Sequence, residues 1–197
     1  AVERMGFAEM TEIQEKTIPV MLAARDVIAK APTGTGKTCA FGIPVAEHID
    51  PEKKYPQAVI MAPTRELAQQ IAEELTELTY FMPEVQVACV YGGANMEKQA
   101  RRLAEGCQIV VATPGRLMDH YKHHSIDLAH VTQVVLDEAD EMLNMGFYKD
   151  VRHIIELMKA RKSLSMFSAT ISREVMDIGW LYQNNAEEIT VQPREES

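Results

Sequence analysis

Two short segments, far apart in the chain, carry residue types that together suit phosphate and metal chemistry. The first is APTGTGKT at residues 31–38, and the second is VVLDEADEML at residues 134–143. Glycines in the first allow a turn whose amides point inward, its lysine can reach terminal phosphates, and its last threonine can bind Mg²⁺. The sequence therefore predicts a nucleotide-binding loop formed by Thr33, Gly34, Thr35, Gly36, Lys37 and Thr38.

This loop departs at one position from the general pattern GxxxxGK[ST], because Ala31 occupies the place of the first glycine. A glycine-rich turn that only caps a helix is the alternative interpretation. The strand-like run DVIAKA before the loop and the helical period after it favour phosphate binding, since a helix begins with free amides and the positive end of its dipole.

The acids of the second segment have a use beside such a loop, because a phosphate-loop enzyme needs an acid for Mg²⁺ and a group that orients the attacking water. Asp137 directly follows the apolar run and is predicted to hold Mg²⁺, through water because this ion sheds its water reluctantly. The adjacent Glu138 is the candidate general base. For Glu141, and in part for Asp140, capping of the next helix is a credible alternative.

Apolar runs and stretches of helical period alternate along the whole chain. Strands are expected at 26–31, 57–63, 85–93, 108–114, 133–138, 163–170 and 187–192, and helices at 11–23, 37–49, from near Thr64 to Leu78, 95–104, 115–123, 148–159 and 172–182. This alternation predicts an α/β fold, a parallel β-sheet with helices on both faces. Ligands bind beyond the carboxyl ends of the strands in such sheets, so the loops after the strands should carry the function.

Length and composition fit one domain at residues 1–192, with residues 193–197 as the start of a linker. Hydrophobic residues make up 46% and charged residues 25% of the chain, and no apolar run is long enough to span a membrane. No signal peptide is evident, so cytoplasmic residence and a monomer without membrane attachment are expected. The three cysteines lack CxxC spacing and indicate reduced thiols.

The net charge of −9 argues against binding of a polyanion through overall basicity. Three predicted strand-end loops, PTRE at 63–66, YGG at 91–93 and TPGR at 113–116, offer local alternatives. Free amides at helix starts bind phosphate without net charge, and paired glycines let a ligand backbone approach. We expect Thr113 to cap the following helix and the arginines to add charged contacts, although each arginine alone would more often form a surface ion pair. The residues expected to bind are Thr64, Arg65, Gly92, Gly93, Thr113, Pro114, Gly115 and Arg116.

At this point the sequence resembles the DEAD-box ATP-dependent RNA helicases. Residues 137–140 spell DEAD, and the chain has segments similar to motif I at 31–38, motif Ia at 63–70, the GG loop at 92–93, motif Ib at 113–116 and motif III at 168–170. Upstream, GFAEMTEIQ resembles the Q motif, with Met10 where the family usually has proline. The resemblance covers nearly the whole chain and implies a RecA-like P-loop NTPase domain that binds RNA.

The resemblance also implies roles for individual residues. Phe7 would stack on adenine and Gln14 would bind its edge. Lys37, Asp137 and Glu138 would be the catalytic group, with Thr38 and Asp137 serving Mg²⁺. The residues implied to couple the nucleotide site to strand separation are Asp140, Ser168 and Thr170. From the residues alone, Ser168 and Thr170 could equally cap the helix that follows.

Helicases of this family have a second RecA-like domain that supplies an arginine finger, and no segment resembling HRxGRxxR occurs here. An absent arginine finger costs about 10³ to 10⁵ in turnover. We therefore expect this chain to bind ATP but to hydrolyse it negligibly and not to unwind RNA alone. The alternatives are an ATP-gated RNA clamp or assembly platform and, against the combined motifs, a phosphate-loop ATPase that acts on DNA or protein.

Overall fold

A computed structural model describes residues 9–33 and 36–192. Its centre is one parallel sheet of seven strands in the order β3-β4-β2-β5-β6-β1-β7. The strands are β1 (Val27–Lys30), β2 (Ala58–Met61), β3 (Val87–Val90), β4 (Ile109–Ala112), β5 (Gln133–Asp137), β6 (Ser163–Ser168) and β7 (Glu187–Thr190). Each lies within a predicted run, so the α/β fold is confirmed.

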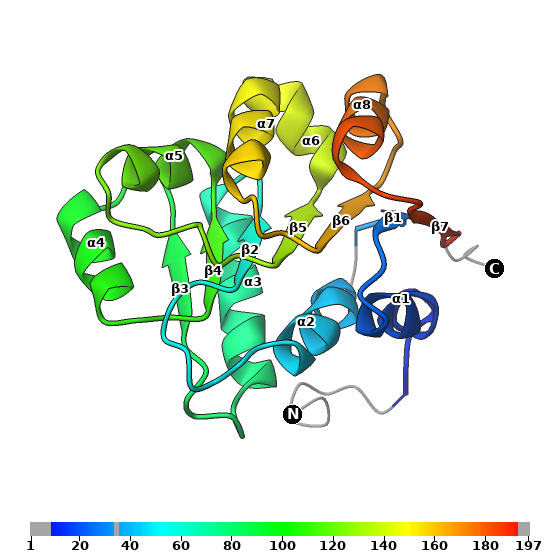
Figure 1. Ribbon diagram of the computed structural model, residues 1–197. Coiled ribbons are helices and arrows are strands. Elements are labelled where there is room, and N and C mark those ends of the chain that lie inside the picture. Colours follow the sequence, from blue (N-terminus) through cyan, green and yellow to red (C-terminus); the bar gives the residue numbers. More distant parts are fainter. Residues whose placement is uncertain (1–8, 34–35, 193–197) are drawn as a thin grey trace.

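Helices cover both faces of the sheet (Figure 1). On one face lie α1 (Glu12–Leu22), α2 (Lys37–Glu47) and α3 (Arg65–Leu78). On the other lie α4 (Met96–Ala104), α5 (Pro114–Lys122), α6 (Ala139–Met142), α7 (Tyr148–Leu157) and α8 (Arg173–Tyr182). None of the described helices is long and apolar enough to cross a membrane.

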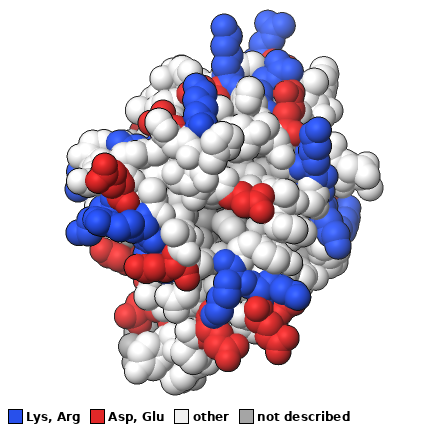
Figure 2. Space-filling view, turned by 60° about the vertical axis from the view of Figure 1, so that its left-hand side comes forward, with Lys and Arg blue, Asp and Glu red and all other residues white. Residues whose placement is uncertain are grey.

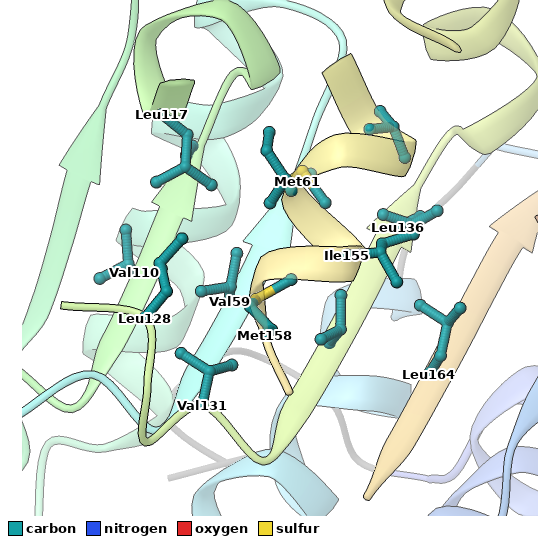
Figure 3. Packing of buried hydrophobic residues seen from close by; sticks show 14 of the residues in the cluster. Val59, Met61, Val110, Leu117, Leu128, Val131, Leu136, Ile155, Met158 and Leu164 are labelled. Carbon is teal, nitrogen blue, oxygen red and sulfur yellow. The ribbon is translucent and has the colours of Figure 1, made fainter. Parts of the chain in front are cut away.

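Two apolar cores result from the alternation of side chains along each strand. In β2, Val59 and Met61 face the core under α4 to α8, whereas Ala58 and Ile60 face the core under α1 to α3. Figure 3 shows part of the first core, with Ile155 of α7 packed over the sheet. Because both faces are covered, β2 and β4 are apolar at every position.

One segment differs from the prediction. Residues 139–147, for which no helix was expected, form α6 and then a π-helical turn, η2 (Leu143–Phe147), which contains Gly146 at φ +91°. Burial of Ala139, Met142 and Leu143 in the core holds this segment against the sheet.

Candidate functional site

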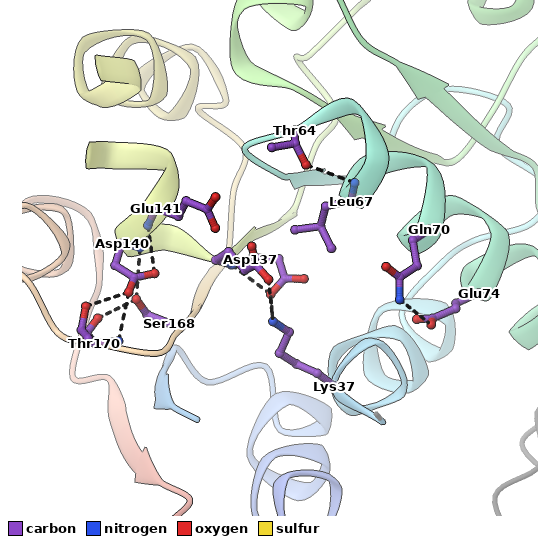
Figure 4. A network of polar contacts seen from close by, with 11 residues as sticks. Lys37, Thr64, Leu67, Gln70, Glu74, Asp137, Asp140, Glu141, Ser168 and Thr170 are labelled. Carbon is purple, nitrogen blue, oxygen red and sulfur yellow. Dashed lines mark hydrogen bonds and ion pairs between the residues drawn. The ribbon is translucent and has the colours of Figure 1, made fainter. Parts of the chain in front are cut away.

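The carboxyl ends of β1 and β5 bring the two chemically suggestive segments together. Lys37 begins α2 after the loop that follows β1, and its Nζ lies 2.9 Å from Oδ1 of Asp137 at the end of β5. The same Nζ lies 3.9 Å from Oε1 of Glu138. Figure 4 shows Lys37 and Asp137 pointing toward each other from α2 and from the end of β5. The three residues predicted to be catalytic therefore form one cluster.

Both acids are perturbed by their surroundings. Burial raises the pKa of Asp137 above its usual value, although the ammonium of Lys37 and the amide of Glu138 counteract this. Burial and a shared hydrogen bond with Glu141 raise the pKa of Glu138 to about 7. Glu138 also has a left-handed backbone, with φ 49° and ψ 51°, which is uncommon for a residue other than glycine. Backbone strain of this kind is concentrated at functional sites.

A cavity of about 340 Å³ lies over this cluster. Its lining residues are Thr33, Lys37, Thr38, Leu67, Gln70, Glu74, Asp137 and Glu138. The α3 side chains Gln70 and Glu74 were not foreseen, and the only sequence signal for them is their helical spacing from Leu67. Oδ2 of Asp137 is buried and has no hydrogen-bond partner among the described residues, so an acceptor for a cation or water is available beside Thr38.

Gln14 is buried and is held at both ends of its amide. Its Oε1 accepts a hydrogen bond from the amide of Thr11, which completes a capping box at the start of α1. Its Nε2 donates to the carbonyl of Gly36 at 3.1 Å. A Cβ on Gly36 would lie 2.8 Å from this Nε2, so only glycine permits the contact. Gln14 therefore connects α1 to the candidate phosphate loop.

Three polar residues beyond the cluster form a second network, also drawn in Figure 4. The hydroxyl of Thr170 donates to Oδ2 of Asp140 at 2.7 Å, and the amide of Asp140 donates to the hydroxyl of Ser168 at 3.1 Å. Burial would raise the pKa of Asp140, but hydrogen bonds from Thr170, Glu141 and Ser168 hold it below its usual value. Helix α8 is capped by Ser172 rather than by Ser168 or Thr170.

The three candidate RNA-contact loops follow β2, β4 and β3, which are adjacent strands. Thr64 caps α3 by accepting from the amide of Leu67. The prediction of a capping hydroxyl at Thr113 is wrong, because this side chain makes no capping bond, and Pro114 occupies the first helical position as expected. Gly115 follows it in the first turn of α5.

Both arginines of these loops contact other residues of the protein, although Arg65 is exposed. The guanidinium of Arg65 lies 4.7 Å from the ring centre of Tyr91. Nη1 of Arg116 donates to the carbonyl of Ala94 at 2.9 Å, and this side chain is only 12% exposed. Its Nε also lies 3.7 Å from Oδ2 of the exposed Asp119, so Arg116 does form an ion pair, but from a side chain that is itself largely buried.

Other predicted residues differ in accessibility. Gly92 and Gly93 are exposed, and Gly93 has φ +83°. The face drawn in Figure 2 carries basic side chains scattered among acidic ones, with a largely uncharged centre. Phe7, Gly34, Thr35 and the expected linker at 193–197 lie outside the described residues.

Comparison with known proteins agrees with this geometry. The model of the DEAD/DEAH box helicase family matches residues 11–178. The chain is 48% identical over 195 residues to the ATP-dependent RNA helicase CshA of Listeria monocytogenes, covering 99% of this chain and 37% of the relative. It is 43% identical over 192 residues to the ATP-dependent RNA helicase DeaD of Escherichia coli, covering 98% of this chain and 30% of that protein.

Two solved structures resemble the chain closely. The hypothetical ATP-dependent RNA helicase from Sulfolobus tokodaii has a TM-score of 0.88 and 40% identity, covering 96% of this chain and 55% of its own. The yeast DEAD-box splicing factor Prp28 has a TM-score of 0.91 and 33% identity, covering 100% and 48%. The chain spans less than half the length of the curated relatives named above. The family match and these identities show that the chain belongs to the DEAD/DEAH box helicase family.

Proposed function

We propose that this chain is the ATP-binding domain of an ATP-dependent RNA helicase, in which ATP binding and hydrolysis are coupled to RNA strand separation. The observation that carries the proposal is the convergence of Lys37, Asp137 and Glu138 at one cavity. The curated relatives named above are called ATP-dependent RNA helicases, which supports the choice of nucleotide and nucleic acid.

In this function, each residue of the cavity has a separate role in phosphoryl transfer. Lys37 exchanges its contact with Asp137 for the terminal phosphates, and the first amides of α2 add donors at a helix start. Glu138 accepts a proton from the attacking water, for which a pKa of about 7 is well placed. The amide of Gln14, which contacts Thr11 and Gly36, would have to exchange one of these bonds to bind the edge of adenine.

The oxygen atoms at this site fit Mg²⁺. Oδ2 of Asp137 is buried without a partner, and Thr38 lines the same cavity; Mg²⁺ commonly uses only one or two protein oxygens and keeps several waters. Asp137 and Thr38 would hold the ion, which supplies neutralisation of the phosphate charge when it is bound. Lys37 remains close enough to orient the phosphates beside it.

RNA would bind at the loops after β2, β3 and β4, through its backbone and without regard to base sequence. The exposed Gly92 and Gly93 leave room for a strand, and the first turns of α3 and α5 provide amides. Asp140, Ser168 and Thr170 join the end of β6 to the acids after β5. This network would transmit the state of the nucleotide to the RNA-binding side.

Efficient hydrolysis would need a second RecA-like domain with an arginine finger, worth about 10³ to 10⁵ in turnover. The test is to titrate residues 1–197 with a fluorescent ADP and to measure RNA-stimulated ATPase. We expect saturable binding that Lys37→Ala abolishes, and ATPase near background. Hydrolysis by residues 1–197 at the rate of a two-domain helicase would contradict the proposal. A strand-displacement assay on a protein that includes the second RecA-like domain distinguishes a helicase from an ATP-gated clamp.

A further inference from the structure

A buried amide, that of Gln99 on α4, connects the loops after β3 and β4. Its Nε2 donates to the carbonyl of Tyr91 at 3.0 Å. Its Oε1 lies 3.1 Å from Nη1 of Arg116 and 3.0 Å from Nε2 of His120. Gln99 and Leu103 are the buried residues of α4, so a polar side chain occupies the inward stripe of this helix.

The chemistry of these contacts fixes the protonation of His120. Oε1 of Gln99 is an amide oxygen and can only accept hydrogen bonds, as it does from Arg116. In the contact with Oε1, Nε2 of His120 must therefore be the donor. His120 therefore carries its proton on Nε2, and its buried Nδ1 has no partner among the described residues. Burial, followed by the charge of Arg116, lowers the pKa of His120 and keeps it neutral.

The backbone of residues 91–94 is held on both sides by this arrangement. Gln99 holds the carbonyl of Tyr91, and Arg116 holds that of Ala94. Gly92 and Gly93 lie between these two anchors, where glycine would otherwise leave the backbone free. The ring of Tyr91 is fixed in turn by Arg65 and by a bond from Gln69 to its hydroxyl at 3.0 Å.

We propose that Gln99 is a positioning residue for RNA binding, which acts by fixing the Gly92–Gly93 backbone and the Arg116 guanidinium in one geometry. Arg116 then serves mainly as an internal clamp and not as a phosphate contact. This inference rests on the proposed RNA-binding function. Its physical basis is that a loop held in its binding conformation before the ligand arrives loses less entropy on binding.

The chain offers a matched control in Gln108, another buried glutamine. Its Oε1 accepts from the amide of Gln86, and its Nε2 donates to the carbonyls of Pro51 and Glu84. Gln108 immediately precedes β4, at the edge of the sheet opposite to the RNA loops. A general loss of stability should therefore be similar in Gln99→Met and Gln108→Met, whereas a positioning effect should appear only in the first.

The experiment compares the wild type with variants of Gln99 and Gln108 by RNA binding and by amide hydrogen exchange. With a fluorescein-labelled oligouridine RNA, we expect Gln99→Met to weaken binding about tenfold and Gln108→Met to leave it unchanged. Without RNA, amides 91–95 should exchange faster in Gln99→Met only. Gln99→Glu keeps an acceptor for Arg116 and His120 and loses only the bond to Tyr91, so its RNA affinity should lie between those of the wild type and Gln99→Met. This variant also provides the test if Gln99→Met does not fold.

Equal RNA affinity and equal exchange in Gln99→Met and the wild type would overturn the inference while leaving the proposed function intact. No RNA binding by the wild type would instead overturn the proposed function and this assignment with it. Arg116→Met provides the last readout. It should weaken binding without changing the slope of log Kd against log salt, and a decrease of about 0.7 in that slope would show a direct phosphate contact.

Discussion

The ammonium of Lys37 and the carboxylate of Asp137 are in contact at 2.9 Å, with side-chain exposures of 11% and 1%. Each of these charges is therefore compensated chiefly by the other. Under the proposed function, a triphosphate would have to replace Asp137 as the partner of Lys37, so the ion pair would compete with the ligand of the site.

Removing one member of this pair should destabilise the protein. Lys37→Met leaves a buried carboxylate without its cation, and we expect a loss of about 3 kcal/mol in the free energy of unfolding. Adding Asp137→Asn should restore most of it, because the amide carries no charge. Urea denaturation near neutral pH measures both, and a double variant no more stable than the single one would contradict the explanation.

Gly92 tests whether a ligand approaches the loop after β3. A Cβ added there meets nothing within 4 Å, so Gly92→Ala should change stability by less than about 1 kcal/mol. We expect RNA affinity nevertheless to fall about tenfold, because only the RNA backbone would meet the new methyl group. Gly93→Ala is the contrast, since φ +83° makes alanine cost about 1 kcal/mol there. Undiminished RNA binding by Gly92→Ala would place the strand elsewhere.

Thr170 tests the network that joins β5 to β6. Thr170→Val removes the 2.7 Å bond to Asp140 and should cost about 1 kcal/mol in stability. In a protein that includes the second RecA-like domain, we expect ATPase to persist and strand displacement to fall. Thr76→Val is the control, because that hydroxyl bonds only within α3. Parallel loss of both activities would argue against a coupling role.

His120 predicts how stability depends on pH. Its folded pKa is lowered by burial and by Arg116, with Asp119 acting in the opposite sense and His123 in the same one. Below pH 6.5 the unfolded chain takes up a proton that the native state resists, so this residue makes the free energy of unfolding fall as pH falls toward the lowered pKa.

Replacing this side chain should flatten that dependence. His120→Leu should lose less stability than the wild type between pH 7.5 and pH 5.5, measured by urea denaturation at both. Asp137 and Glu138 have the opposite effect on the pH dependence of stability, because carboxylates with raised pKa values bind extra protons in the native state. Both proteins contain these acids, so their effect cancels when the wild type and His120→Leu are compared. His153→Leu, at an exposed position, controls for the loss of one histidine. Equal pH dependence of wild type and His120→Leu would refute this assignment.

The fold was predictable because the central strands of a covered parallel sheet contain nearly continuous apolar runs. Runs such as VVL before Asp137 and IVVA in β4 therefore stand out, and parallel strands place their carboxyl ends at one edge. The meeting of Lys37 with Asp137 follows from that rule. The starts of two helices were also predictable at Thr11 and near Thr64, and the hydroxyls of these residues cap α1 and α3.

The features that escaped prediction depend on contacts between distant segments. The turn at 143–147 is held by the packing of Leu143 in the core. In the sequence, the preceding Asp140 and Glu141 indicated only residues that cap the next helix. The internal contacts of Arg116 on α5 depend on Gln99, which lies on the preceding helix, α4, with β4 between them. A usable signal was present, because a glutamine four residues before Leu103 interrupts the apolar stripe of α4.

The pairing of β1 has a consequence for the order in which the protein is assembled on the ribosome. β1 is synthesised before the other strands of this sheet, but its neighbours are β6 and β7, the last of the seven to emerge. Until then, the apolar side chains of Val27 and Ala29 lack lateral partners, and a nascent chain would need α1 and α2 to shield them. β1, although it is the first strand of this sheet to be made, is thus among the last to reach its native surroundings.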